Sequence, residues 1–305
     1  MLILSLDGGG IRGLIAATVL ENLEADTGKL TREIFEGVAG TSTGGIIACA
    51  VAAGIPMSKI KALYKDKAEV IFTSGFLKEL ESVGGLTDEK YNPEGLEDCL
   101  LDLFGDAKLS QSPIRLLVPA CDLAGQPVLF RSESAKQDLM FDFFLRDVCR
   151  ATSAAPTFFP PAKIKSMAGT ASFPLMDGGL AANQPAMCAI IDAMGRAALP
   201  NITLVSLGTG WTPEVRTLNE AENCGLLSGG APLLRIMFSG PGYITDWQCS
   251  TLLGMNGYIR LQPVLPSPIE MDTTEEKDLA TLELLGNSLC ESSDYHRLVA
   301  MAKGE

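Results

Sequence analysis

The chain has 305 residues, of which 47 % are hydrophobic and 20 % charged, a composition that suits one large or two small globular domains and excludes disordered and fibrous proteins. Its 37 acidic and 24 basic side chains give a net charge of −13, which disfavours a nucleic acid polymer as partner. It contains one histidine, His296, so sites that need two or more histidines, such as HExxH zinc sites, are excluded.

The first third of the chain predicts two strands, each followed by a glycine-rich turn and a helix. Residues 2–6 form an apolar run that predicts a buried strand, and residues 13–25 carry helical spacing after a glycine loop. Residues 34–39 predict a second strand, and residues 46–53 an apolar helix that ends at a glycine. The loose basic run that follows is interpreted as a solvated helix face; it consists of Lys59, Lys61, Lys65 and Lys67.

The rest of the chain continues this alternation. Strands are expected over residues 114–120, 128–130, 172–176 and 202–206, and helices over about 58–70, 94–104, 141–151, 184–197 and 276–290. Such an order predicts a mostly parallel sheet with helices on both faces. Because no repeat or long linker divides it, we expect residues 1–305 to form one domain, with residues 211–305 as its C-terminal helices and surface segments.

The spacing of the cysteines and the length of the apolar stretches indicate in which cellular compartment the protein lies. The eight cysteines lie far apart in the sequence without metal-binding spacing, and the N-terminus lacks the basic start of a secretory signal. The longest apolar stretch, residues 44–56, is too short to span a bilayer. We therefore expect free thiols and a cytoplasmic protein.

The pentapeptide Gly40-Thr41-Ser42-Thr43-Gly44 has the form GxSxG. About 0.2 chance matches are expected in a chain of this length, so the context of the motif has to carry the interpretation. It falls between a predicted strand and a predicted helix, where a sharp turn would expose the Ser42 hydroxyl as a nucleophile, and glycines at both ends let the two elements pass closely. The alternative is a Gly-Ser loop that caps a helix.

The first loop, Asp7-Gly8-Gly9-Gly10-Ile11-Arg12-Gly13, also follows a strand and opens a helix. Its backbone N–H groups suit an anion, either a nucleotide phosphate or the oxyanion of an acyl transfer. A dinucleotide site would need an acidic residue at the end of the next strand, and a P-loop would need Gly-Lys-Ser/Thr; neither is present. We therefore favour an oxyanion hole over a phosphate site, with a plain tight turn as the alternative.

A nucleophilic serine needs a base, and His296 lies near the C-terminus, where a polar surface residue is the simpler interpretation. Asp177, in Asp177-Gly178-Gly179, follows a predicted strand and is the favoured candidate over a turn aspartate. A carboxylate with an ordinary pKa is a weak base, but it suffices if proton transfer is concerted with attack and N–H groups stabilise the oxyanion.

Together these motifs resemble the patatin-like phospholipase family. The resemblance covers about residues 1–210 and includes Arg150-Ala-Thr-Ser-Ala-Ala-Pro-Thr-Phe-Phe-Pro160 and Asn183-Gln184-Pro185, in which Gln184 replaces the asparagine of many members. It implies a three-layer α/β/α fold with a central, mostly parallel sheet, and hydrolysis of phospholipid or lysophospholipid esters without metal or cofactor. It also implies a catalytic dyad of Ser42 and Asp177, and an oxyanion loop formed by Gly8, Gly9, Gly10 and Arg12, to which the turn after Ser42 adds the N–H of Thr43.

A lipid substrate implies transient binding to a phospholipid membrane, peripheral to the inner membrane. Since the net charge of −13 disfavours anionic lipid, docking needs a local apolar surface. The polar segment 73–92 could form a mobile cover, and Phe72, Phe76, Leu77 and Leu80 are the docking candidates, with an amphipathic helix face as the alternative.

Two other functions stay open. Compact bacterial proteins that resemble this one include antiphage effectors that degrade membrane phospholipid after binding a cyclic oligonucleotide, so a cyclic di- or trinucleotide could be an activator. The sequence contains no diagnostic motif for that ligand. A non-catalytic nucleotide-binding module is the third possibility, and the oligomeric state is left open.

Overall fold

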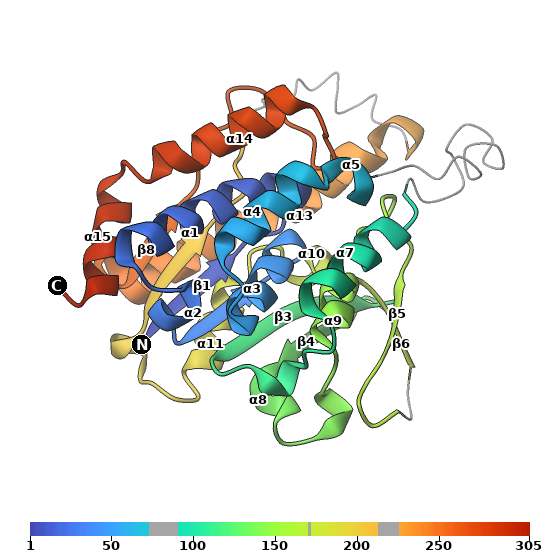
Figure 1. The fold of residues 1–305 in the computed structure, drawn as a ribbon, viewed down its shortest axis with the longest axis horizontal. Helices are drawn as coiled ribbons and strands as arrows, with labels where there is room; N and C mark the ends of the chain where they lie inside the picture. The colour runs from blue at the N-terminus through green and yellow to red at the C-terminus, as the bar shows by residue number, and fades with distance from the viewer. Residues whose placement is uncertain (73–90, 170–171, 213–225) are drawn as a thin grey trace.

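The computed structural model describes residues 1–72, 91–169, 172–212 and 226–305, which form a mixed eight-stranded sheet between two layers of helices (Figure 1). The strand order is β5-β6-β3-β2-β1-β7-β8, and β4 also pairs with β3. The pairs among β3, β2, β1, β7 and β8 are parallel, whereas β4, β5 and β6 join by antiparallel pairs. The strands are β1 (Leu2–Leu6), β2 (Gly37–Gly40), β3 (Arg115–Asp122), β4 (Pro127–Arg131), β5 (Ala162–Lys165), β6 (Ser172–Asp177), β7 (Thr203–Leu207) and β8 (Tyr258–Leu261).

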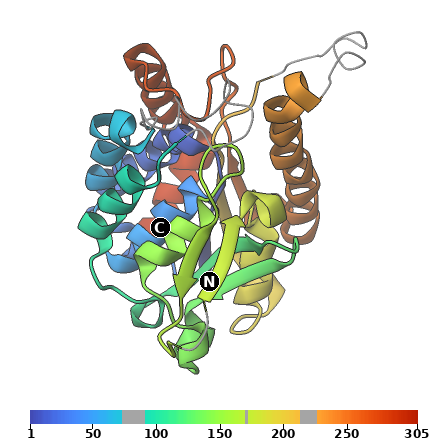
Figure 2. The same cartoon turned by 90° about the vertical axis from the view of Figure 1, so that its right-hand side faces the viewer.

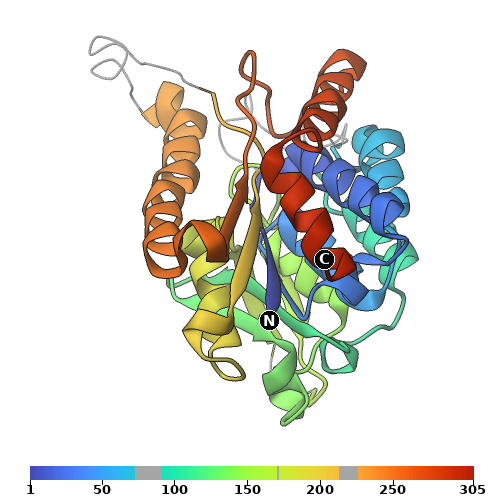
Figure 3. The same ribbon diagram turned by 90° about the vertical axis from the view of Figure 1, so that its left-hand side faces the viewer.

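Alternating side chains of the strands face two separate apolar cores. Leu4 and Leu6 of β1 point into the larger core, and Ile3 points into the smaller one, as the period of two along a strand requires. Figures 2 and 3 show the two helical layers on either side of the sheet. The larger core is covered by α1 (Leu14–Thr27), α3 (Thr43–Ala53), α4 (Met57–Asp66), α7 (Glu94–Phe104), α9 (Leu145–Thr152), α14 (Glu276–Leu289) and α15 (Ser293–Lys303), and the smaller by α11 (Ala186–Ala193) and α13 (Leu226–Gly257). The predicted three-layer α/β fold with a mostly parallel sheet is confirmed.

The structure corrects several predicted boundaries. Residues expected to begin the second strand end a helical turn, α2 (Thr31–Ile34), and β2 starts at Gly37. The single helix expected over residues 58–70 is divided at Lys67, whose φ of −119° and ψ of 6° are not helical, so α5 (Ala68–Ile71) is separate. The helix expected over residues 184–197 begins after Pro185 and ends at Ala193, with the turn α10 (Gly179–Ala182) before it.

Residues beyond 210 contribute to the same sheet. β8 pairs in parallel with β7, which pairs with β1, so the last strand extends the sheet that the N-terminal strands begin. Neither β8 nor the long helix α13 was expected from the sequence. α13 is interrupted at Gly254, whose φ of 64° lies outside the helical region. No helix within the described ranges is long and apolar enough to cross a bilayer.

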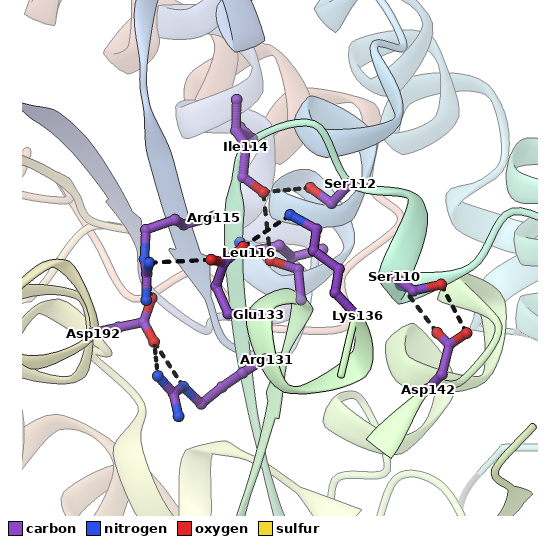
Figure 4. Close-up of polar contacts among 11 residues, drawn as sticks. Ser110, Ser112, Ile114, Arg115, Leu116, Arg131, Glu133, Lys136, Asp142 and Asp192 are labelled. Atoms are coloured by element: carbon purple, nitrogen blue, oxygen red, sulfur yellow. Dashed lines mark hydrogen bonds and ion pairs between the residues drawn. The ribbon is translucent and has the colours of Figure 1, made fainter. Parts of the chain in front are cut away.

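In the basic run, Lys59, Lys65 and Lys67 are exposed, as a solvated helix face predicts, whereas Lys61 is half-buried. The Lys61 ammonium lies 2.8 Å from Glu21 and 2.7 Å from Glu283, and Lys65 lies 2.8 Å from Glu283. At the amino ends of the parallel strands, Asp192 of α11 forms ion pairs with Arg115 of β3 and with Arg131 of β4 (Figure 4). These ion pairs join helices and strands away from the glycine loop and the GxSxG turn.

Candidate active site

Ser42 lies at the tight turn between β2 and α3. Its φ of 54° and ψ of −122° are strained for a residue with a side chain, and its N–H donates to the Thr152 hydroxyl at 2.9 Å. The turn is so close that a Cβ on Gly44 would lie 2.3 Å from the Leu6 carbonyl oxygen. Backbone strain held by such contacts is typical of the exposed nucleophile of a strand-turn-helix motif, as the sequence predicts.

Asp177 ends β6, and its carboxylate is 1 % exposed. The Gly179 N–H donates to Oδ1 of Asp177 at 2.6 Å. Burial raises the pKa of Asp177 to about 7, against the lowering effect of the hydrogen bonds from the Gly179 N–H and from the Ser42 side chain. Asp177 lines the same cavity as Ser42, whose side chain affects its pKa, and its carboxyl group has the proton affinity of a general base working near neutral pH.

Residues 152–154 connect the two groups. The Thr152 hydroxyl accepts the Ser42 N–H and donates to the Pro119 carbonyl at 2.6 Å. The Thr152 carbonyl accepts the Gly178 N–H at 3.1 Å, and the Ala154 carbonyl accepts the Asp177 N–H at 2.9 Å. This segment belongs to the Arg150–Pro160 motif, and its bonds hold Ser42 and Asp177 in a fixed relation.

The glycine loop lies beside Ser42. A Cβ on Gly8 would lie 3.4 Å from the Ser42 Cβ. The Gly8 N–H is already used, since it donates to the Asn183 carbonyl at 3.0 Å. Within the described part of the chain, the N–H groups of Gly9 and Gly10 have no acceptor. These two N–H groups, from residues that line the same cavity as Ser42, are thus available to an oxyanion.

Of the other residues predicted to form the oxyanion hole, only Thr43 lines the cavity. Thr43 begins α3 and lines the cavity, and its hydroxyl is hydrogen-bonded to that of Tyr64. Gly8 and Arg12 do not line the cavity, and Arg12 Nε donates to the Gly9 carbonyl at 3.4 Å. Arg12 therefore supports the loop from behind.

The cavity in front of these groups encloses about 800 Å³, including its mouth. Its polar lining includes Ser42, Asp177 and Asn183. The remaining wall is apolar and comes mainly from α3, α4, α5, α7, the loop after α9, and α13; it includes Ile46, Leu63, Ile71, Phe72, Leu96, Cys99, Leu100, Phe158, Phe159 and Phe238. A mostly apolar cavity that also presents Ser42 and Asp177 fits an ester with an aliphatic chain.

Several expected groups lie elsewhere or outside the described residues. His296 is exposed on α15 and does not line the cavity. Phe72 lines the cavity instead of the surface, whereas Phe76, Leu77 and Leu80 fall within residues 73–90, outside the described ranges. In the part of the chain that the structure describes, no group of three or more His, Cys, Asp or Glu side chains could hold a metal ion.

Sequence reasoning missed two residues that hold the site, Thr152 and Arg260. The Arg260 guanidinium pairs with the Asp7 carboxylate at 2.6 Å, although 253 residues separate them. Thr152 stood within a recognised motif and could have been singled out there. Arg260 lies in a stretch without any motif, so no sequence signal marked it.

The chain is similar to several known proteins. The sequence profile described as "Patatin-like phospholipase" matches residues 4–190. Patatin-like protein 2 of Arabidopsis thaliana is 38 % identical over 85 % of this chain and 75 % of its own length, and Patatin-T5 of Solanum tuberosum is 29 % identical over 95 % and 84 %. Among solved structures, VipD from Legionella pneumophila aligns with a TM-score of 0.44 and 15 % identity, over 94 % of this chain and 66 % of its own.

The profile spans the glycine loop, the GxSxG turn and the Asp-Gly-Gly turn that the fold brings to one cavity. The relatives match most of the remaining chain as well, so the strands and helices beyond residue 190 are part of the shared sequence. The chain belongs to the patatin-like phospholipase family, and with it to the lipid acyl hydrolases.

Proposed function

We propose that the chain hydrolyses acyl esters of membrane phospholipids or lysophospholipids, with Ser42 as nucleophile and Asp177 as general base. The observation that carries this proposal is the presence, in the cavity that Ser42 lines, of a buried carboxyl group whose pKa is raised to about 7 and is affected by the Ser42 side chain. An aspartate with an ordinary pKa near 4 would hold a proton too weakly to deprotonate a hydroxyl efficiently.

In the first step, Ser42 Oγ attacks the ester carbonyl carbon while its proton passes to the Asp177 carboxylate. The carbonyl oxygen gains the negative charge, and the N–H groups of Gly9, Gly10 and Thr43, residues that line the cavity, are the donors proposed to stabilise it. The C–O bond to the leaving alcohol then breaks, and the proton on Asp177 passes to that oxygen. An acyl-enzyme on Ser42 and a free alcohol result.

In the second step, water takes the place of the departed alcohol. Asp177 accepts a proton from this water as it attacks the acyl carbon, and the same N–H groups again stabilise the oxyanion. Collapse of the intermediate returns the proton to Ser42 Oγ and releases the fatty acid. One base thus serves both steps, and no histidine is required.

The apolar wall of the cavity supports a lipid as substrate. Burying an aliphatic chain against Leu96, Leu100 and Phe159 removes apolar surface from water at about 25 cal/mol per Å². Since about 0.8 kcal/mol is gained per buried methylene, a long acyl chain binds more tightly than a short one. The family description, patatin-like phospholipase, supports the same substrate class.

Mass spectrometry of a total phospholipid extract incubated with the chain tests this function. The wild type is expected to release free fatty acid and lysophospholipid, or to consume lysophospholipid, and Ser42→Ala is expected to leave the extract unchanged. Equal product release by both proteins would refute Ser42 as nucleophile. Separation of the products by chain length and sn-position identifies the substrate.

Two further predictions concern partners. Transient docking to a phospholipid surface is expected from the substrate class, and sedimentation with liposomes, compared with Phe76→Asp, tests it. Activation by a cyclic di- or trinucleotide stays a prediction, which thermal-shift and lipase measurements with a panel of these compounds test.

A further inference from the structure

The glycine loop is held from behind by residues that follow position 200. The Asp7 N–H donates to the Leu207 carbonyl at 3.0 Å, and the Thr209 hydroxyl donates to the Gly8 carbonyl at 2.9 Å. The Ile11 N–H donates to the Met271 carbonyl at 2.8 Å. Both ends of the loop are therefore fixed by segments outside the region that the family profile matches.

Arg260 makes the one charged contact in this set. Its Nη2 lies 2.6 Å from Oδ2 of Asp7, and its Nη1 donates to the Ser206 hydroxyl at 2.7 Å. Its Nε lies 3.9 Å from Oδ1 of Asp246 on α13. The guanidinium group is thus fixed by the strand beside it and the helix behind it, and it presents one nitrogen to the residue at the start of the loop.

Asp7 depends on this contact. Its side chain is about 8 % exposed, and its other oxygen, Oδ1, is buried without a hydrogen-bond partner in the described part of the structure. Burial raises the pKa of Asp7, and the charge and hydrogen bond of Arg260 oppose that rise. If Arg260 were lost, a buried carboxyl group would have to find water or another donor, and the backbone at Asp7 and Gly8 would move with it.

We propose that Arg260 is a positioning residue, which through Asp7 holds the N–H groups of Gly9 and Gly10 where the oxyanion forms. The proposal rests on the proposed function, because it assigns the loop to the oxyanion of that reaction. Oxyanion donors act by geometry: a displacement of about 1 Å can cost about a hundredfold in rate, because the charge develops at one fixed point. Substrate binding to the apolar wall does not use these donors, so the Michaelis constant should be spared.

The main variants are Arg260→Gln, which removes the charge, and Arg260→Lys, which keeps the charge but loses the two-nitrogen fork. Arg115→Gln is the matched control. Arg115 is the first residue of β3, at the amino ends of the parallel strands. Its side chain is 9 % exposed and its Nε lies 2.7 Å from Asp192, so its loss also removes a buried ion pair (Figure 4). Any effect of merely weakening the fold should appear in both Gln variants.

The measurements are kcat and KM for a soluble p-nitrophenyl ester, the inhibition constant of a trifluoromethyl ketone with the same acyl chain, and the melting temperature. A serine hydroxyl adds to the carbonyl group of this ketone and gives a tetrahedral oxyanion, so the inhibition constant reports on the oxyanion site. Arg260→Gln is expected to lower kcat at least tenfold, to raise the inhibition constant by a similar factor, and to leave KM within twofold. Arg260→Lys is expected to lie between it and the wild type, and Arg115→Gln to change only the melting temperature.

Other results overturn the proposal. An unchanged kcat and inhibition constant in Arg260→Gln, or a loss of kcat shared by Arg115→Gln, would give Arg260 a structural role alone. If Arg260→Gln does not fold, the double variant Asp7→Asn/Arg260→Gln replaces it, because it leaves no unpaired buried charge. The same fall in kcat is expected in the double variant, and a wild-type kcat in that protein would refute the proposal. A wild type without Ser42-dependent hydrolysis would overturn the proposed function itself, which is a different result from an active wild type with an unaffected Arg260→Gln.

Discussion

Asp177→Asn should abolish hydrolysis and at the same time stabilise the folded chain at alkaline pH. The wild-type carboxyl group is 1 % exposed, and burial raises its pKa from about 3.8 to about 7. A group whose pKa is higher in the folded state favours folding when it is protonated, and this advantage is lost as the pH rises through the folded pKa. Above pH 7 the ionised, buried carboxylate therefore destabilises the folded wild type, whereas asparagine at this position carries no charge.

The size of the effect follows from the two pKa values. Each unit of difference between the folded and unfolded pKa corresponds to about 1.4 kcal/mol of folding free energy. The raised pKa therefore destabilises the folded wild type by about 4 kcal/mol at pH 9 and by about 2 kcal/mol at pH 5. Any effect of asparagine on packing is the same at both pH values and cancels in the comparison. The stability of Asp177→Asn relative to wild type should thus increase by about 2 to 3 kcal/mol between pH 5 and pH 9.

Urea unfolding followed by circular dichroism at pH 5 and pH 9 measures this difference. Ser42→Ala is the control, because it inactivates the same site and keeps the carboxyl group. It removes a hydrogen bond that lowers the Asp177 pKa, so its stability relative to wild type should fall, and not rise, between pH 5 and pH 9. A relative stability of Asp177→Asn that is equal at the two pH values, or lower at pH 9, would refute the raised pKa and with it the basis for Asp177 as a base near neutrality.

Four further predictions concern activity. Because Asp177 must be ionised to accept a proton and its pKa is about 7, kcat/KM for a soluble ester should rise with pH and be about tenfold lower at pH 6 than above pH 8; a flat profile would exclude it as the base. His296→Ala should retain kcat/KM within twofold, since His296 is exposed outside the cavity, and complete loss of activity in a folded protein would require a histidine-based mechanism. Cys99→Trp should fill part of the apolar wall and lower the ratio of kcat/KM for long over short p-nitrophenyl esters by about tenfold or more, and an unchanged ratio would remove Cys99 from the acyl-binding wall. Gly10→Ala places a Cβ 2.1 Å from the Met271 carbonyl oxygen at a φ of 60°, so kcat should fall by about a hundredfold, and wild-type kcat would show that the loop is not used.

Ser42 and Asp177, the proposed catalytic pair, could be singled out in the sequence because their signals are local. Ser42 needs a tight turn between strand and helix, which places glycines at fixed positions on either side, and Asp177 precedes the two glycines that let its carboxylate accept a nearby N–H. Short apolar runs before each of these turns gave the strands, since a buried strand shows as such a run. The order of these elements was then sufficient for the fold class.

The support of the site could not be predicted in this way. Arg260 meets Asp7 only because β8, β7 and β1 lie side by side in the sheet, and nothing near either residue in the sequence encodes that pairing. The raised pKa of Asp177 arises from burial by elements distant in the sequence, so the sequence left its strength as a base open. Boundaries failed where a single backbone conformation decides them, as at Lys67, where the helix breaks without glycine or proline.

Rapid chemical quench followed by peptide mapping tests the central claim most directly. The chain is mixed with an acyl ester, stopped in acid before the first turnover is complete, digested, and analysed by mass spectrometry for a covalently bound acyl group. The account predicts the acyl mass on the peptide that contains Ser42, formed in the wild type and absent in Ser42→Ala. An acyl group on another residue, or fatty acid release with no acylated peptide at any quench time, would contradict it.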